Sequence, residues 1–163
     1  MADDNTAQMK KIPLRGEKGK GLYALVDADD FNMVSNYKWS LRAGYVAAYI
    51  PGSGKHMSLH RMIMNPPRDM VMDHINFDKL DNRKCNLRVC TRSNNSIHRK
   101  PYGSKRFKGI HFDKTRKKWN VSLRCRNSFV WIGRFNDPMS AARAYDEKAK
   151  QLHGEFAYLN FNK

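Results

Sequence analysis

The sequence is poor in cysteine and has no long hydrophobic run. Its three cysteines, Cys85, Cys90 and Cys125, cannot all pair within one chain, so we expect free thiols in a reducing compartment. No apolar stretch approaches the length of a membrane-spanning helix, and residues 1–20 lack the apolar core of a secretory signal. These absences predict a cytoplasmic protein that is not secreted and does not associate with a membrane.

The cysteines also lack the spacing of a structural zinc site. Such sites use closely spaced pairs of Cys or His, and the sequence contains no CxxC pair. His98 lies near Cys85 and Cys90 in the sequence, but Cys125 stands alone inside a predicted strand. Thiols that behave as small apolar residues are the favoured interpretation, and we expect no zinc.

Acidic residues are scarce beside basic ones. The chain has 31 Lys and Arg against 15 Asp and Glu, a formal net charge of +16, which implies an anionic partner. The sequence has no strong basic amphipathic helix, so nucleic acid is favoured over an acidic membrane surface. The excess of basic residues is concentrated between Arg99 and Arg126, a stretch that contains eleven Lys and Arg and a single acidic residue, Asp113.

The length of 163 residues suits one compact domain or two small ones. Residues 1–20 are predicted to be a polar lead-in. Apolar alternation and turn residues then predict strands at 22–26, 38–41, 45–50, 71–75 and 86–90. Short helices are expected from about residue 27, within 55–64, and after Thr91, which is a suitable N-cap.

The last third has the clearest pattern. Residues 99–104 are basic, contain Pro and Gly, and are predicted to be a linker. Three strands are expected at 105–112, 118–126 and 128–135, the second with alternating apolar and polar residues. A helix with Asp137 as N-cap should follow and end at Gly154. Its expected apolar stripe consists of Ala142, Tyr145, Ala149 and Leu152.

A polar constellation occupies the middle of the chain. Asp73 and His74 are neighbours on a predicted strand; alone, they would be interpreted as a surface carboxylate beside a partly buried imidazole. Asn86 follows His74 by twelve residues, and Asn95 follows Asn86 by nine. The predicted order of elements is strand, loop, strand, helix, and polar side chains lie on the first strand, at the start of the second strand and on the helix.

This stretch resembles the HNH nucleases, in the His-Asn-Asn form found among homing endonucleases of phages and introns. The matching pieces are "DHIN", "DNR", "NLR" and "SNN", with "LHR" upstream. The ββα-metal site of that family implies that His74 is a general base and that Asn86 braces the loop. It also implies that Asp73 and Asn95 bind the metal, and Asn94 and His98 remain alternatives to Asn95.

The residue types suit phosphodiester hydrolysis. A neutral histidine can take a proton from water near physiological pH. One hard divalent cation, held by a carboxylate oxygen and an amide oxygen, can bind the scissile phosphate. We therefore expect Mg²⁺, with Mn²⁺ as a possible substitute. Arg83, Arg88 and Arg92 are candidates for contacts with flanking phosphates.

Residues 105–161 resemble a second family, the APETALA2-type DNA-binding domain, in which three strands pack on one helix. The pieces "FKGI", "KKWNVSLR" and "VWIGRF" carry the resemblance, together with the helix sequence that follows. His111 and Phe129 stand where the family commonly has Arg, so base specificity does not transfer. The expected DNA-binding residues are Lys105, Arg106, Lys108, His111, Arg116, Lys118, Ser122, Arg124, Arg126, Trp131 and Arg134.

Together the patterns predict an α+β fold. A ββα-metal HNH nuclease core is preceded by a small mixed region and followed by a three-stranded antiparallel sheet packed on one helix. The expected domains are a lead-in at 1–20, the nuclease domain at 21–98, a linker at 99–104 and the DNA-binding domain at 105–163.

The expected function is site-specific cleavage of double-stranded DNA by an enzyme of the phage or mobile-element type, which implies the cytoplasm of a bacterial host. The alternative is a non-catalytic, sequence-specific DNA-binding regulator on the same scaffold. An RNA-binding protein would rest on charge alone, because the sequence has no RNP-type strand motif or GXXG clamp. No heptad seam indicates a dimer, so a monomer is favoured.

Overall fold

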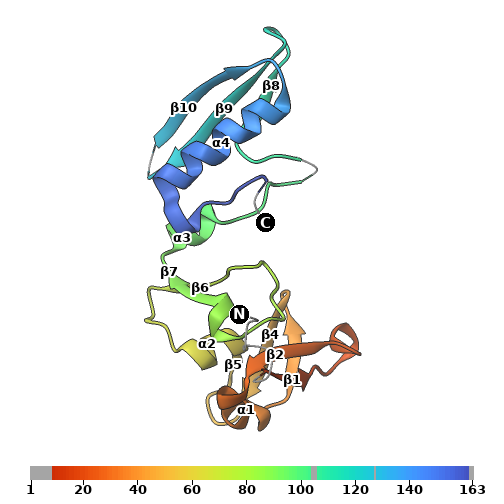
Figure 1. Cartoon of the computed structure of the whole chain (residues 1–163). Helices are drawn as coiled ribbons and strands as arrows, with labels where there is room; N and C mark the ends of the chain where they lie inside the picture. Colours follow the sequence, from red (N-terminus) through yellow and green to blue (C-terminus); the bar gives the residue numbers. More distant parts are fainter. Residues whose placement is uncertain (1–8, 104–105, 127, 162–163) are drawn as a thin grey trace, which may run out of the picture. The chain divides into compact units, whose positions relative to one another are not determined.

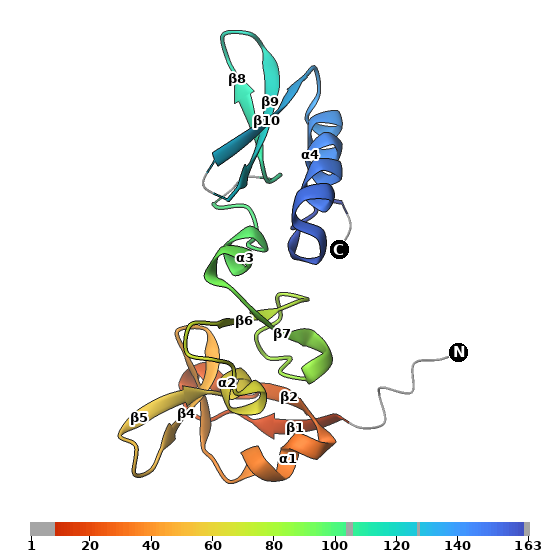
Figure 2. The same ribbon diagram turned by 90° about the vertical axis from the view of Figure 1, so that its left-hand side faces the viewer.

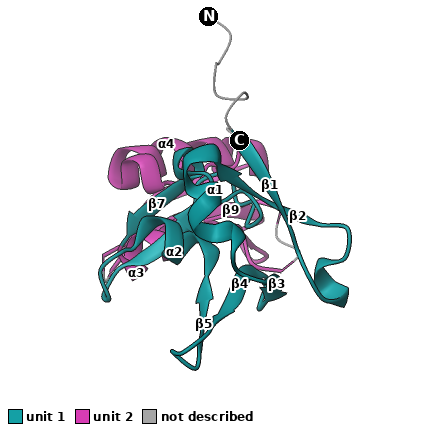
Figure 3. Ribbon diagram, turned by 90° about the horizontal axis from the view of Figure 1, so that it is seen from below, with its two compact units in different colours: residues 1–90 teal, residues 91–163 magenta. Residues whose placement is uncertain are grey.

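The structure is a computed structural model, which describes residues 9–103, 106–126 and 128–161. The fold is α+β, as predicted, with several small antiparallel sheets and few helices (Figures 1 and 2). The chain forms two compact units, an N-terminal unit of residues 1–90 and a C-terminal unit of residues 91–163 (Figure 3). The domain boundaries drawn from the sequence remain predictions. None of the helices in the described part of the chain has the length and hydrophobicity that crossing a bilayer requires.

The N-terminal unit begins with a strand that the sequence analysis did not predict. β1 (Met9–Pro13) pairs antiparallel with β2 (Tyr23–Asp27), and the short helix η1 (Glu17–Gly19) lies between them. Ile12 and Leu14 are buried, so this part of the expected polar lead-in contributes to the core. The strand is hard to see in the sequence because two lysines precede Ile12 and leave little apolar alternation.

A second sheet and two helices complete the core of this unit. α1 (Ala28–Ser35) is followed by β3 (Trp39–Arg42), β4 (Tyr45–Ile50) and β5 (Lys55–Ser58), which pair in that order. α2 (Leu59–Met64) continues directly from β5. Trp39 is fully buried, and its indole Nε1 donates a hydrogen bond to the carbonyl oxygen of Val34 at 2.8 Å. This bond satisfies the one polar atom that the large side chain carries into the core.

A two-stranded sheet closes the N-terminal unit. β6 (Val71–His74) pairs antiparallel with β7 (Leu87–Cys90), and the short helix η2 (Lys84–Asn86) precedes β7. Asp73 lies opposite Arg88 in this register. The loop between the strands is joined to β2, since the amide of Leu25 donates to the carbonyl oxygen of Leu80 at 2.8 Å. Asp73, His74 and Asn86 of the predicted site therefore sit on a short hairpin that is fastened to the core.

The C-terminal unit starts with α3 (Arg92–Ile97) and continues with β8 (Ile110–Asp113), β9 (Lys118–Cys125) and β10 (Ser128–Phe135). The sheet order is β10-β9-β8, and both pairings are antiparallel. α4 (Pro138–His153) lies along one face of this sheet, and the short helix η3 (Gly154–Phe156) follows it (Figure 2). β8 is shorter than expected at its start, because Arg106–Gly109 do not form a strand.

Small residues let α4 approach the sheet closely. Val121 and Leu123 of β9 pack against Ala141, Tyr145 and Ala149 of the helix. Both predicted helix caps are present, because Thr91 Oγ1 accepts from the amide of Asn94 at 3.2 Å and Asp137 Oδ1 from that of Ser140 at 2.8 Å. Leu152, predicted to lie in the apolar stripe, is instead 39% exposed in the last turn.

Candidate functional site

His74 ends β6 and is buried among aromatic rings. Its Nε2 atom lies 3.4 Å from the side-chain oxygen of Asn82. The ring centroid of His60 is 5.3 Å away in an edge-to-face arrangement, and that of Tyr45 is 6.2 Å away. An amide oxygen can only accept, so the contact with Asn82 places the ring proton on Nε2 and leaves the basic lone pair on Nδ1.

Both imidazoles of this cluster are held in the neutral form. Burial lowers the pKa of His74, although the hydrogen bond with Asn82 and the charge of Asp73 oppose the shift. Burial, together with the charges of His74 and Arg61, lowers the pKa of His60 to about 4. A neutral imidazole keeps a lone pair for a proton at physiological pH, which is the state a general base requires.

Asp73 is buried and makes an ion pair across the hairpin. Its Oδ2 atom accepts hydrogen bonds from Arg88 at 2.9 Å from Nε and 2.7 Å from Nη2. The side chain of Arg88 is only 11% exposed, so the pair is largely removed from solvent. Arg88 had been a candidate for a phosphate contact, and the structure places it against the carboxylate instead.

Asn86 connects the two sides of the hairpin loop. Its Nδ2 atom donates to the carbonyl oxygen of Asp81 at 2.8 Å, and its Oδ1 atom accepts from the amide of Asn76 at 2.9 Å. The amide of Ile75 donates to the carbonyl oxygen of Asn86 at 2.9 Å. Asn86 thereby fixes both residues that directly follow His74, Ile75 through its backbone and Asn76 through its buried side chain, which needs no charge for this task.

Asn82 and Asp81 have roles that the sequence analysis did not assign. Asn82 is fully buried, contacts His74, and donates from Nδ2 to the carbonyl oxygens of Lys79 at 3.2 Å and Leu80 at 3.1 Å. Asp81 holds Arg83 through two bonds of 2.8 Å, and these bonds lower the pKa of its carboxyl group against the effect of burial. The only signal in the sequence was the "DNR" piece, in which both residues lie.

Asn95 belongs to the C-terminal unit, on α3, whereas Asp73 belongs to the N-terminal unit. Asn94 and Asn95 are half-buried, and His98, the C-cap of α3, is buried. Within the described ranges, no three His, Cys, Asp or Glu side chains gather in a way that could hold a metal ion. A ligand pair of one carboxylate and one amide is a different kind of site, so Asp73 and Asn95 remain predicted ligands.

The outer face of the C-terminal sheet carries exposed cationic and aromatic side chains. Trp131 is 54% exposed and lies opposite Ser122 in the register of β9 and β10. The guanidinium of Arg134 is 5.4 Å from the ring centroid of Trp131, and its Nε donates to Asn120 at 3.3 Å. A flat ring beside a fixed cation can meet both the bases and the phosphates of a nucleic acid.

Most of the other predicted DNA-binding residues are also at the surface. Ser122 is half-buried, Arg116 is exposed and forms an ion pair with Asp113 at 3.2 Å, and Lys105 lies outside the described residues. The remaining exposed members of the predicted set are Arg106, His111, Lys118, Arg124 and Arg126.

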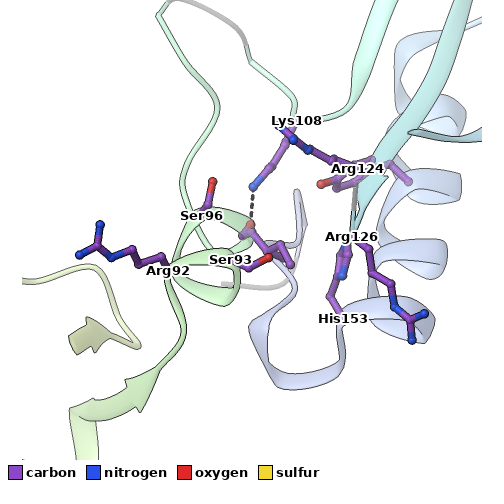
Figure 4. Close-up of a pocket in the computed structure, with 9 residues that line it drawn as sticks. Arg92, Ser93, Ser96, Lys108, Arg124, Arg126 and His153 are labelled. Carbon is purple, nitrogen blue, oxygen red and sulfur yellow. Dashed lines mark hydrogen bonds between the residues drawn. The ribbon is translucent and has the colours of Figure 1, made fainter. Parts of the chain in front are cut away.

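Lys108 differs from this set. Its Nζ atom donates to the carbonyl oxygen of Ile97 (Figure 4), and to that of Arg99 at 2.7 Å. Burial, and then the charge of Arg99, lowers the pKa of Lys108 to about 8. The same side chain lines a cavity of about 360 Å³ that also has Arg92 and Ser93 of α3 in its wall. The ammonium group is thus directed toward α3.

The stretch that holds these residues also matches known proteins. The model of a family described as HNH endonuclease matches residues 60–97, a range that includes His60, His74, Asn86 and Asn95. An uncharacterized HNH endonuclease of Acanthamoeba polyphaga mimivirus is 33% identical over 150 residues, which cover 88% of this chain and 77% of that protein.

Two plant proteins match shorter segments. Dehydration-responsive element-binding protein 2A of Arabidopsis thaliana is 46% identical over 46 residues, 27% of this chain. An AP2/ERF and B3 domain-containing protein of Oryza sativa subsp. japonica is 38% identical over 58 residues, 36% of this chain. These segments span only 14% and 16% of the plant proteins. No solved structure matches the chain.

The mimivirus match extends along most of both chains, well beyond the short range of the family model. The homing and phage attributes expected from the sequence have no counterpart among these matches and stay predictions. The extent of the match establishes the family: this chain belongs to the HNH endonucleases.

Proposed function

We propose that the chain is a metal-dependent, site-specific endonuclease of double-stranded DNA, with His74 as its general base. The observation that carries the proposal is the environment of His74. This imidazole is buried, has a lowered pKa, and is oriented by the side-chain oxygen of Asn82. An imidazole in an aromatic core has no structural need for a fixed tautomer, whereas a general base must present its lone pair in one direction.

His74 would take a proton from water at Nδ1. The contact with Asn82 holds the Nε2 proton, and the rings of His60 and Tyr45 restrict rotation of the imidazole. Asn86 supports the same geometry from the backbone, because it fixes Ile75 and Asn76 directly after the base. A base held at one angle to its water loses less entropy when the reaction begins.

Asp73 would hold the divalent cation, with Asn95 as the second protein ligand. Carboxylate and amide oxygens are donors that Mg²⁺ accepts, and Mn²⁺ would fit the same donors. When bound, the cation would stabilise the negative charge that develops on the phosphate and on the leaving oxygen. Arg88 is already bonded to Asp73 and would hold this carboxylate in one orientation.

The C-terminal sheet would bind the DNA duplex. Its exposed face combines Trp131 with the cations of Arg124 and Arg134, and a β-sheet of this size can enter the major groove. One of the plant proteins similar to this chain is named as an element-binding protein, which supports the same assignment.

Cleavage of supercoiled plasmid tests the proposal. The wild-type protein should cut in Mg²⁺ and stop when the metal is chelated. His74→Ala should reduce the rate by about 10²–10⁴-fold, because it removes the base. His56→Ala, an exposed histidine of the same unit, is the matched control and should cut normally.

DNA affinity and melting temperature should be measured on the same variants. His74→Ala should keep near wild-type affinity, because His74 makes no phosphate contact in this proposal. A His74→Ala protein that cuts at the wild-type rate would refute the assignment of the base. A wild-type protein that binds a specific DNA site but never cuts it, in Mg²⁺ or Mn²⁺, would instead favour a non-catalytic regulator.

A further inference from the structure

The ammonium group of Lys108 is bonded to the carboxyl end of α3. It donates to the carbonyl oxygens of Ile97, the last residue of the helix, and of Arg99. Figure 4 shows the side chain reaching from its own loop to this helix end. Carbonyl groups at the end of a helix have no partners within the helix, and a cation placed there satisfies them and opposes the helix dipole.

The backbone of Lys108 is fixed as firmly as its side chain. Its amide donates to Asn160 Oδ1 at 2.8 Å, and Asn160 Nδ2 donates back to its carbonyl oxygen at 3.3 Å. Asn160 is in turn held by Asp146 of α4, which accepts from its amide at 2.8 Å. A continuous chain of bonds therefore connects α4 to the end of α3 through Lys108.

The next residue adds a steric constraint to the same segment. Gly109 has a positive φ of 77°, and a Cβ atom at this position would lie 2.0 Å from two ring atoms of Tyr145. The backbone therefore passes directly against the core side chain of α4. The backbone of Lys108 and Gly109 therefore has little conformational freedom. Such a residue cannot adapt its position to a phosphate, but it can hold a neighbouring element in place.

We infer that Lys108 is a positioning residue: it fastens α3, and with it Asn95, to the sheet of the C-terminal unit. This inference rests on the proposed function, in which Asn95 is a metal ligand. It replaces the DNA contact predicted for Lys108 from the sequence. Its consequence is that the sheet and the helix that carries Asn95 behave as one body, so that placement of the sheet on DNA also sets the place of Asn95.

Lys108→Met tests this inference, because methionine keeps an unbranched side chain but has no N–H donor. Lys118→Met is the matched control, since Lys118 is an exposed cation of the same unit. Amide hydrogen exchange of the full-length protein, without metal, reports the stability of α3. Lys108→Met should speed exchange of the amides that close this helix, those of Asn95 and His98, by about tenfold or more, and Lys118→Met should not.

DNA affinity should separate the two roles. Lys108→Met should bind DNA within about twofold of wild type, with an unchanged dependence on salt, whereas loss of a phosphate contact flattens the slope of log affinity against log salt by about one. In Mg²⁺, Lys108→Met should cut more slowly at saturating DNA and need more metal for half its maximal rate. A flattened slope with normal α3 exchange, or no change in either, would overturn the inference.

A measurement on the wild-type protein covers the case in which Lys108→Met does not fold. Acylation by an excess of an amine-reactive ester should label Lys108 at the same rate with and without DNA, because its ammonium group contacts α3, whereas added DNA should slow the labelling of Lys118. Labelling of Lys108 that DNA suppresses would identify a DNA contact and refute the role of Lys108 as the residue that fastens α3. Exchange, affinity and labelling require no cleavage, so an inactive wild-type protein would count against the proposed function alone.

Discussion

His60 gives a sharp prediction about how stability depends on pH. The residue is 8% exposed, its Nε2 lies 3.1 Å from Ser58 Oγ, and its buried Nδ1 has no hydrogen-bond partner among the described residues. Burial, with smaller contributions from His74 and Arg61, lowers its pKa from 6.5 to about 4. Replacement by phenylalanine removes the titrating group and keeps an aromatic ring beside His74.

The direction in which pH changes the free energy of unfolding follows from the protons that the folded and unfolded states bind. Between pH 6.5 and about 4, His60 of the unfolded chain binds a proton that the folded chain does not bind. The free energy of unfolding therefore falls as pH falls through this window. At about 1.4 kcal/mol for each pKa unit, the full effect is about 3 kcal/mol, and about 2 kcal/mol of it is lost between pH 7.5 and pH 5.

Urea unfolding at pH 7.5 and pH 5.0 measures the effect. Trp119→Phe and Trp131→Phe in every sample leave Trp39 as the only tryptophan, so its fluorescence follows the N-terminal unit. The loss of stability on acidification should be about 2 kcal/mol smaller in His60→Phe than in the parent. His56→Gln, an exposed control, should keep the parental loss. Equal losses in the parent and in His60→Phe would show that His60 titrates normally and that the cluster is not closed to water.

Further predictions concern other parts of the chain. Gly109→Ala should destabilise the C-terminal unit by about 2–5 kcal/mol, because it combines backbone strain with overpacking against Tyr145; thermal melting measures it, and a loss below 1 kcal/mol would contradict the close contact. Asp137→Ala should lower the melting temperature of the C-terminal unit because α4 loses its cap, and an unchanged melting temperature would show that the cap contributes nothing. Asn86→Ala should lower the cleavage rate with little change in DNA affinity, because it releases the loop after His74; equal cleavage by mutant and parent would count against this role. On a plasmid with one target, nicked circles should accumulate before linear DNA, because one base cuts one strand; linear product without that intermediate, from a dimer in solution, would refute a monomer.

The features that the sequence predicted well depend on neighbours in the chain. The caps at Thr91 and Asp137 are local, because each side chain bonds an amide three residues later. The hairpin that carries His74 was also predictable, since strand alternation is a short-range pattern. Cleavage and the roles of the site residues remain predictions that rest on the family and on the geometry around His74.

The features that the sequence did not predict depend on contacts between distant segments. Asn82 matters because the loop folds it under His74, a contact that no spacing rule anticipates. β1 is a strand because β2 is available to pair with it. Lys108 looks like any other surface cation of a basic segment, and only the fold brings it to α3.

The bonds from Lys108 to α3 also affect how such proteins can be recombined. The basic stretch at 99–104 resembles a domain linker, the usual place to join two genes when one DNA-binding domain is exchanged for another. A hybrid joined there would keep α3 from one parent and take the residue that fastens it from the other, so the carbonyls of Ile97 and Arg99 would lose their partner unless the new domain supplied an equivalent lysine. A junction before Thr91 would transfer the helix and its fastening together, and makes the better site for building hybrids with new target sequences.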